Sequence, residues 1–147
     1  MKTKIASLSL LFAVAIGFVA CEKPERVITF EQLPATAQQF VNQHFATCEI
    51  AYIIEDPSTL DHSYTVQFLN NYEIEFDGDG EWTEVDCVRD SVPIAIVPAA
   101  ITAYVTQHFA QQFVVKISYE HRKYEVKLNT SLELVFDRKG NFKYIDD

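Results

Sequence analysis

Acidic residues and histidines are the side chains in this sequence whose types and spacing could support chemistry. The segment Asp77-Gly78-Asp79-Gly80-Glu81 has the composition of the start of a calcium loop. An EF-hand loop, however, runs for about twelve residues to a bidentate glutamate and lies between helices. Here the flanking segments have strand character, and Asp first with Gly fourth is the chemistry of a type I turn closed by a glycine bulge. The sequence favours a hairpin turn over a calcium site.

The other candidates predict neither a metal centre nor a catalytic centre. His44 and His108 stand one per predicted helix in matching segments, which duplication explains, and no His or Cys pair has zinc-ligand spacing. Glu73 and Glu75 alternate along a predicted strand, where solvent keeps them ordinary surface acids. The chain also lacks a Gly-rich phosphate loop and a Gly-x-Ser-x-Gly elbow. We therefore expect no catalytic residue, no metal and no cofactor, and a protein that is not an enzyme.

These side chains belong to a pattern that the chain contains twice. The segment 33–45 returns 64 residues later as 97–109, and the segment 64–80 returns 60 residues later as 124–140. The difference between the two offsets falls in a loop-like stretch of the first copy. A repeat this complete predicts two copies of one local fold that pack together.

Each copy predicts one helix followed by four strands. Pro34 and Pro98 suit first helical turns, where a missing N–H costs nothing, and apolar residues follow at helical spacing. The segments 64–68 and 72–76 alternate strictly between apolar and polar residues, and the second copy repeats this alternation with Val135 as an exception. Such alternation is typical of strands with one buried and one solvated face.

The third turn of each copy determines which face the last strand presents. A three-residue loop closed by Gly80 would pair Phe76 with Trp82 and place both aromatic rings on the helix-covered face. It would leave Val85, and Ile145 in the second copy, on the open face. A two-residue loop would reverse these assignments, because a slip of one residue turns every side chain to the other face.

The cysteines after the first 21 residues are predicted to be two buried free thiols. Cys48 opens the first strand of its copy and Cys87 closes the fourth, so a simple meander places them about 14 Å apart. A disulfide requires a Cα separation below about 7 Å. The second copy has other residues at both positions, so the repeat does not need the bond.

The start of the chain has the features of an export signal. Two lysines precede an apolar run, 5–20, that is shorter than the roughly 20 residues of a membrane-spanning helix. The run ends in Phe18-Val19-Ala20-Cys21, which resembles the lipobox of bacterial lipoproteins. The resemblance implies a signal peptide over 1–20, a diacylglyceryl lipid on Cys21 and attachment to a membrane. Glu22 after the cysteine favours an outer-membrane lipoprotein that faces the periplasm or the cell surface.

Four segments follow the predicted signal peptide. We expect a lipidated tether at 21–32, a first repeat at 33–87, a linker at 88–96 and a second repeat at 97–147. The net charge of the chain is −9, and the acid is unevenly placed. The part before residue 91 and after Cys21 carries 15 Asp and Glu against 3 Lys and Arg, whereas the rest carries 6 against 7. Because a phosphate backbone would be repelled, nucleic acid is excluded as a partner.

The order of these motifs, twice over, resembles the PepSY-like, beta-lactamase-inhibitor-like domain family. The shared features are a Leu-Pro helix start, a Tyr-x-Val strand, an acidic strand ending in Phe-Asp, and Gly-x-aromatic after the turn. They cover 33–86 and 97–146. The resemblance implies an α+β fold in which two tandem αβ4 units form a curved antiparallel sheet with helices on one face. It also implies binding rather than catalysis.

The leading hypothesis is a lipid-anchored binding module of the bacterial envelope, such as an enzyme or protease inhibitor, that uses the open sheet face. Its partner would be an unidentified envelope protein or peptide. Two alternatives stay open: a binder of a small ligand or peptide in the groove between the repeats, and a calcium-stabilised structural lipoprotein. The predicted binding face consists of Thr65, Gln67, Glu73, Glu75, Glu125, Lys127, Glu133, Val135 and Lys143.

Overall fold

The computed structural model describes residues 24–58 and 62–146. The predicted signal peptide, Cys21 and the start of the tether lie outside the described residues. The first half contains β1 (Arg26–Ile28), a short 3-10 helix η1 (Phe30–Gln32), α1 (Ala35–His44), β2 (Ile50–Asp56), β3 (Ser63–Phe68), β4 (Glu73–Asp77) and β5 (Trp82–Asp86). The second half contains α2 (Ala99–His108), β6 (Val114–Glu120), β7 (Lys123–Leu128), β8 (Glu133–Asp137) and β9 (Phe142–Asp146).

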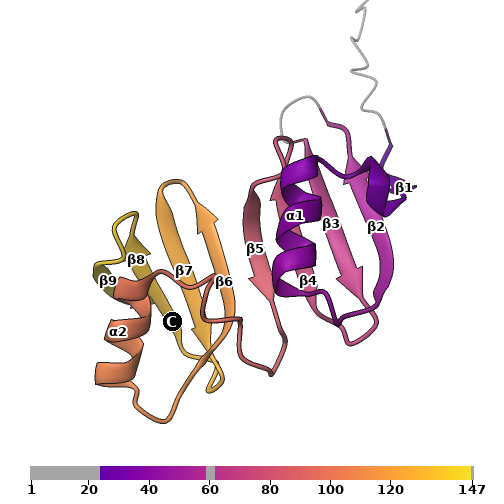
Figure 1. Ribbon diagram of the computed structural model, residues 1–147. Helices are drawn as coiled ribbons and strands as arrows, with labels where there is room; N and C mark the ends of the chain where they lie inside the picture. Colours follow the sequence, from indigo (N-terminus) through magenta and orange to yellow (C-terminus); the bar gives the residue numbers. More distant parts are fainter. Residues whose placement is uncertain (1–23, 59–61, 147) are drawn as a thin grey trace, which may run out of the picture.

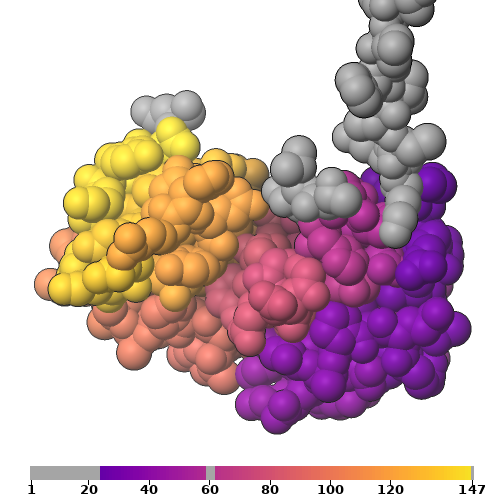
Figure 2. All heavy atoms as spheres, turned by 90° about the horizontal axis from the view of Figure 1, so that it is seen from above, coloured from indigo at the N-terminus to yellow at the C-terminus, as the bar shows by residue number. Residues whose placement is uncertain are grey.

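The strands form one antiparallel sheet of nine strands, in the order of the chain from β1 to β9. Helices α1 and α2 lie on the same face of this sheet and leave the other face open (Figure 1). The two halves are joined by the pairing of β5 with β6, and Figure 2 shows them as one continuous body. The predicted α+β class and antiparallel sheet are therefore confirmed. None of the helices in the described residues has the length and apolar character needed to cross a membrane.

The predicted tether is shorter than expected, because part of it belongs to the sheet. Arg26, Val27 and Ile28 pair with β2, and Ile28 is buried in the core. The Arg26 guanidinium also donates to the buried Glu55 carboxylate over 2.7 Å. The charged composition of this segment suggested a tether. Its strand pairing is not visible in the local sequence, because the residue that Arg26 contacts lies almost thirty positions further along the chain.

Both helices pack aromatic side chains against the strands. Phe40 of α1 meets Phe76 edge to face with ring centroids 5.7 Å apart, and it stacks near Trp82. Tyr104 of α2 meets Phe136 in the same manner at 5.4 Å. Edge-to-face and offset stacking are the favoured arrangements of aromatic rings. The aromatic residues therefore mark the helix-covered face in both halves.

The predicted three-residue loops are present. Phe76 pairs with Trp82, and the corresponding residues of the second half pair in the same way. The Asp77 carboxylate accepts hydrogen bonds from the backbone N–H groups of Asp79 and Glu81, and Gly80 has a φ of 83°. This is the type I turn with a left-handed glycine that the sequence indicates.

The predicted open-face positions of Val85 and Ile145 are wrong. A second bulge follows each turn, so that Glu75 pairs with Glu84 instead of Thr83. The extra residue returns Val85 to the helix-covered face, where it pairs with Ile74 and is 0% exposed. Ile145 has the same register on β9. A bulge depends on neighbouring strands, so the turn sequence does not reveal it.

Both described cysteines are free thiols. Cys87 is buried, whereas Cys48 is only half-buried, which differs from the expectation of two buried thiols. Burial, with the charges of Asp86 and Asp90, raises the pKa of the Cys87 thiol to about 12. Because the thiolate is the reactive form, Cys87 is unreactive at neutral pH.

Candidate functional site

The open face of the sheet is built from the polar residues of alternating strands. On β3 and β4, Thr65 pairs with Glu75 and Gln67 pairs with Glu73, and all four are half-buried. Their sequence neighbours are the buried residues of the core, as strict alternation requires. The Gln67 amide donates to the backbone carbonyl of Tyr72 over 2.9 Å, so this side chain is engaged within the protein.

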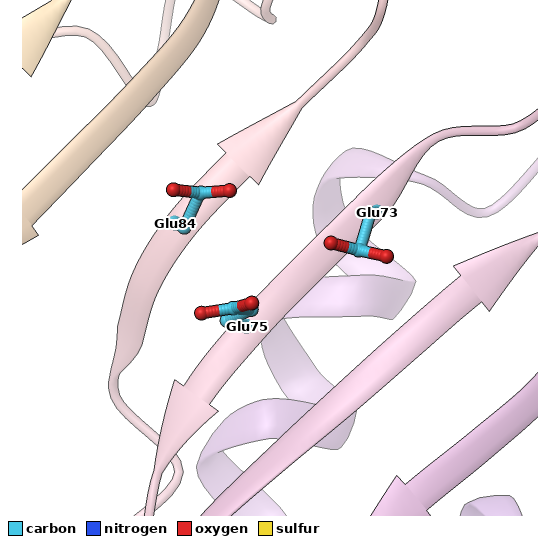
Figure 3. Close-up of side chains that lie close together, drawn as sticks. All are labelled: Glu73, Glu75 and Glu84. Atoms are coloured by element: carbon cyan, nitrogen blue, oxygen red, sulfur yellow. The ribbon is translucent and has the colours of Figure 1, made fainter.

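Three glutamates gather on this face. Glu73 and Glu75 come from β4 and Glu84 comes from β5, and one carboxylate oxygen of each lies within 4.8 Å of the others. Figure 3 shows the three side chains on the side of the sheet away from α1. We call these three residues the glutamate triad. The sequence did not predict Glu84 as a member, because the bulge at Thr83 reversed its expected face.

The electrostatics of the glutamate triad are unfavourable for three ionised groups. Burial raises the pKa of Glu75, and the carboxylates of Glu84 and Glu73 raise it further. Lys116 on β6 is the neighbouring cation, with its Nζ 2.5 Å from Glu84 and 3.8 Å from Asp86. Burial alone would lower the pKa of Lys116, but the hydrogen bond and charge of Glu84 raise it overall.

The open face of the second half is paired rather than acidic. Lys127 lies 3.0 Å from Glu133, and Lys123 lies 2.6 Å from Glu125. Three predicted binding residues, Glu125, Lys127 and Glu133, therefore already form ion pairs within the protein. The other cation of the predicted face, Lys143, is exposed at the bulge of β9.

Val135 does not belong to an accessible binding face. It lies between Glu125 on β7 and Tyr144 on β9, and it is only 2% exposed. Cross-strand neighbours share one face of a sheet, so these two larger side chains flank it. The sequence pattern gave an apolar residue at an open-face position, and the structure buries it there.

The glutamate triad is a property of the first half alone. The register of β8 and β9 repeats that of β4 and β5 with an offset of 60 residues. The positions of Glu73, Glu75 and Glu84 are taken there by Glu133, Val135 and Tyr144. Because the second half forms the same strands without three acids, the fold does not require the triad.

A shallow hollow lies beside the triad, where the two halves join. It has a volume of about 190 Å³. Its polar lining includes Glu84, Lys116, Ser118, Glu125, Lys127 and Glu133, from β5 to β8. Sequence reasoning missed Lys116 and Ser118, because β6 is largely apolar and gave no clear alternation.

The turn that has the composition of a calcium loop has its main carboxylate already engaged. Asp77 accepts two backbone hydrogen bonds at 3.0 Å each. In the second half, Asp137 takes the place of Asp77. The Asn141 side chain donates a hydrogen bond to the Asp137 carboxylate and thereby lowers its pKa. The turn chemistry therefore accounts for these residues without a metal.

A family model described as beta-lactamase-inhibitor-like, PepSY-like matches residues 62–144. The match extends across the junction of β5 and β6 and includes most of the open face. The chain belongs to this PepSY-like family. The family assignment made from the sequence motifs is thus confirmed.

Three solved structures are similar to this PepSY-like protein over most of its length. A candidate calcium-regulated periplasmic protein from Bacteroides thetaiotaomicron is 44% identical, with a TM-score of 0.80, covering 84% of this chain and 97% of its own. A candidate periplasmic protein of the DUF2874 family from Bacteroides vulgatus is 38% identical, with a TM-score of 0.81 and coverages of 85% and 98%. A further candidate periplasmic protein of unknown function from Bacteroides vulgatus is 32% identical, with a TM-score of 0.80 and coverages of 84% and 100%. None of the curated proteins is significantly similar.

These relatives support the cell envelope as the location of the PepSY-like protein, because all three are described as periplasmic. The predicted lipid on Cys21 lies outside the described residues and stays a prediction. The same holds for the outer membrane as its place of attachment.

Proposed function

We propose that the protein is a lipid-anchored binding module of the bacterial envelope, which engages a protein or peptide with the open face of its sheet. The observation that carries this proposal is the glutamate triad. Three carboxylates gather on a face that no helix covers, although the other half of the sheet forms without them. Three neighbouring carboxylates repel one another, and an unfavourable arrangement that the fold does not require is typical of a functional site.

The charges favour a partner that presents basic groups. Like charges at short distance raise each other's pKa, and an approaching cation relieves that repulsion. Lys116 contacts only Glu84 among the three triad carboxylates within 4 Å, so Glu73 and Glu75 lack an ion-pair partner among the described residues. Inhibition of an enzyme or protease is one form that such binding would take, in line with the family description. We expect the module to be no enzyme itself.

The proposal is tested by cross-linking in the native envelope followed by affinity capture. Replacing Glu73, Glu75 and Glu84 by glutamine should remove the captured partner. The matched control replaces Glu25, Glu49 and Glu81, three exposed acids outside the triad, by glutamine and should keep it. Equal capture by both triple variants would show that the open face only maintains solubility.

A second candidate function is calcium binding at the glutamate triad. It is favoured by the spacing of the three carboxylates and by the relative that is described as a candidate calcium-regulated protein. Calcium prefers six to eight oxygen ligands, several of them carboxylates. Calorimetric titration with calcium should then give a signal that Glu84→Gln abolishes and Asp79→Lys leaves intact. Loss of the signal in Asp79→Lys instead would place the ion at the turn.

The remaining parts of the proposal concern architecture and location. The two halves would be tandem αβ4 units of one duplicated module, anchored by lipid at Cys21 to the outer membrane. A small-ligand site at the junction of the halves ranks behind a protein partner. The hollow there measures about 190 Å³, below the roughly 300 Å³ at which typical small-molecule sites begin.

A further inference from the structure

The outer edge of β9 is the feature from which we draw a further inference. β9 is the last strand of the sheet, and no strand in the described part of the chain pairs with its outer side. An edge strand presents a row of backbone donors and acceptors that can pair with another chain. Whether this edge is suited to pairing can be judged from β5, which has the same register and does pair.

β5 shows how such an edge accepts a strand. Its Val85 pairs with Ile117 of β6, and Cys87 N–H donates to the Val115 carbonyl over 2.8 Å. Hydrogen-bonded pairs alternate along antiparallel strands, so Val85, two residues before Cys87, also directs its backbone groups toward β6. Ile145 holds the place of Val85 on β9. Its N–H and C=O therefore point away from β8, toward the free edge.

The two strands differ in how far their side chains are covered. Val85 is 0% exposed, whereas Ile145 is 45% exposed and Tyr144 is 49% exposed. Bulges and lysines can protect an edge from pairing, and β9 has both at Lys143. β5 contains the same bulge at Thr83 and still pairs with β6. The bulge therefore does not prevent a strand from adding at this edge.

The opposite edge of the sheet is formed by β1. There β1 pairs with β2 and places Ile28 opposite Ile53, much as β5 places Val85 opposite Ile117 of β6. Ile28 is buried at this position. The edge strand at that end is therefore the three-residue β1, whereas the edge strand at the other end is the five-residue β9, and the two lie at opposite ends of the molecule (Figures 1 and 2).

We propose that β9 pairs with β9 of a second copy, so that two sheets join into one continuous antiparallel sheet. Charge identifies the second copy as the occupant. Residues 22–90 carry 15 acids against 3 Lys and Arg, whereas residues 91–147 carry 6 against 7. Pairing through β9 brings the two nearly neutral halves together and keeps the acidic halves at the far ends. It is the edge at which two copies meet with the least repulsion.

Two-fold symmetry restricts the register of this pairing. The axis between two antiparallel strands lies midway between a residue and its own copy, which is an isologous contact. Ile145 satisfies this condition, because its outward N–H and C=O can exchange two hydrogen bonds with the partner subunit's Ile145. The isoleucines then bury each other on the helix side. Tyr144 lies opposite the partner subunit's Asp146 on the open face.

The first test is the oligomeric state in solution, measured by sedimentation velocity over a range of concentrations. Residues 24–147 are suitable because they contain every helix and strand of the described chain. We expect a concentration-dependent dimer. Ile145→Lys should weaken it at least tenfold, whereas Val27→Lys on β1, at a side chain that is 74% exposed, should leave it unchanged. A monomer at all concentrations, or a dimer that only Val27→Lys disrupts, would overturn the proposal.

The second test addresses the register and separates edge pairing from loss of folding. Ile145→Pro removes the outward N–H without removing a bond to β8, so it should abolish the dimer and keep a cooperative melting transition. Ile145→Cys should form an intermolecular disulfide in the full chain in cells, because the two residues face each other. Tyr144→Cys should form it much more slowly. Equal rates for the two cysteine variants would contradict this register.

Discussion

At the scale of single residues, two glutamates show how position alters an ordinary carboxylate. Glu55 is buried but accepts from Arg26 and lies 3.1 Å from His62, and the hydrogen bond from Arg26 lowers its pKa. Glu75 is half-buried on the open face without such a partner, and burial raises its pKa. The Glu55 carboxylate forms an ion pair with Arg26 within the fold, whereas the Glu75 carboxylate has no ion-pair partner among the described residues. This contrast is why we assign binding to the glutamate triad.

Glu75→Gln should stabilise the protein at neutral pH. The folded-state pKa of Glu75 lies above its unfolded value, so its ionisation costs stability as the pH rises from about 4.5 through the raised pKa. Glutamine removes this cost, and we expect a gain of up to about 1 kcal/mol at pH 7. Urea denaturation at pH 7 and below pH 4 measures it. The gain should vanish at the acidic pH, and a gain that persisted there would point to packing rather than charge.

At the scale of elements, the turn after β4 determines how α1 meets the sheet. Gly80 has a φ of 83°, and a Cβ at this position would lie 2.6 Å from Cβ of Pro34. The same residue thus closes the hairpin and allows the start of α1 to approach. A left-handed conformation and a close approach together leave room only for glycine.

Gly80→Ala should therefore destabilise the protein by about 1–3 kcal/mol through strain in the turn and displacement of α1. Gly78→Ala in the same turn is the matched control, because Gly78 has no positive φ and its nearest side-chain atom, Cβ of His62, would lie 3.2 Å away. We expect a smaller loss there. Thermal denaturation of both variants compares the two, and equal losses would mean that the approach of Pro34 is not limiting.

The bulges of β5 and β9 lead to a second prediction at this scale. Val85→Ala should cost about 2 kcal/mol, because the residue is fully buried beneath the helices. Ile145→Ala should cost less than about 1 kcal/mol in dilute solution, since Ile145 is half exposed in the single molecule. Chemical denaturation of the two variants decides between this register and the one without bulges, for which both residues would lie on the open face and both losses would be small.

At the scale of the whole molecule, charge and attachment act together. The acidic half follows directly after the predicted lipid site, and its open face carries the glutamate triad. A lipid at Cys21 would hold this half near the membrane, with β1 as the first strand of the described residues. The nearly neutral half with β9 would then lie furthest from the attachment point along the sheet.

Cys21→Ser should release the protein from the membrane fraction, because its thiol is the predicted site of the diacylglyceryl group. Fractionation of cells that express the natural and the variant chain measures this directly. A variant with serine at residue 48 serves as the control, since Cys48 lies in the folded part and should not affect attachment. Persistence of the Cys21→Ser chain in membranes would exclude the lipid anchor.

Much of the fold could be predicted from the sequence because it depends on local patterns. The alternation in Tyr64–Phe68, the turn residues Asp77 and Gly80, and the pairing of Phe76 with Trp82 all depend on residues within a few positions of each other. Periodicity and turn chemistry are properties of a short stretch of chain, so the sequence contains them. The same reasoning led to the PepSY-like family.

Features that depend on distant partners follow from the tertiary structure and not from local patterns. β1 exists because Arg26 meets Glu55, the triad forms because a bulge turns Glu84 toward Glu75, and Val135 is buried by strands on both sides. Each of these depends on the register between strands, where one extra residue exchanges the two faces. The strands and their turns follow from the residues of each short stretch of chain, whereas the pairing of strands sets which side chains are gathered into a site.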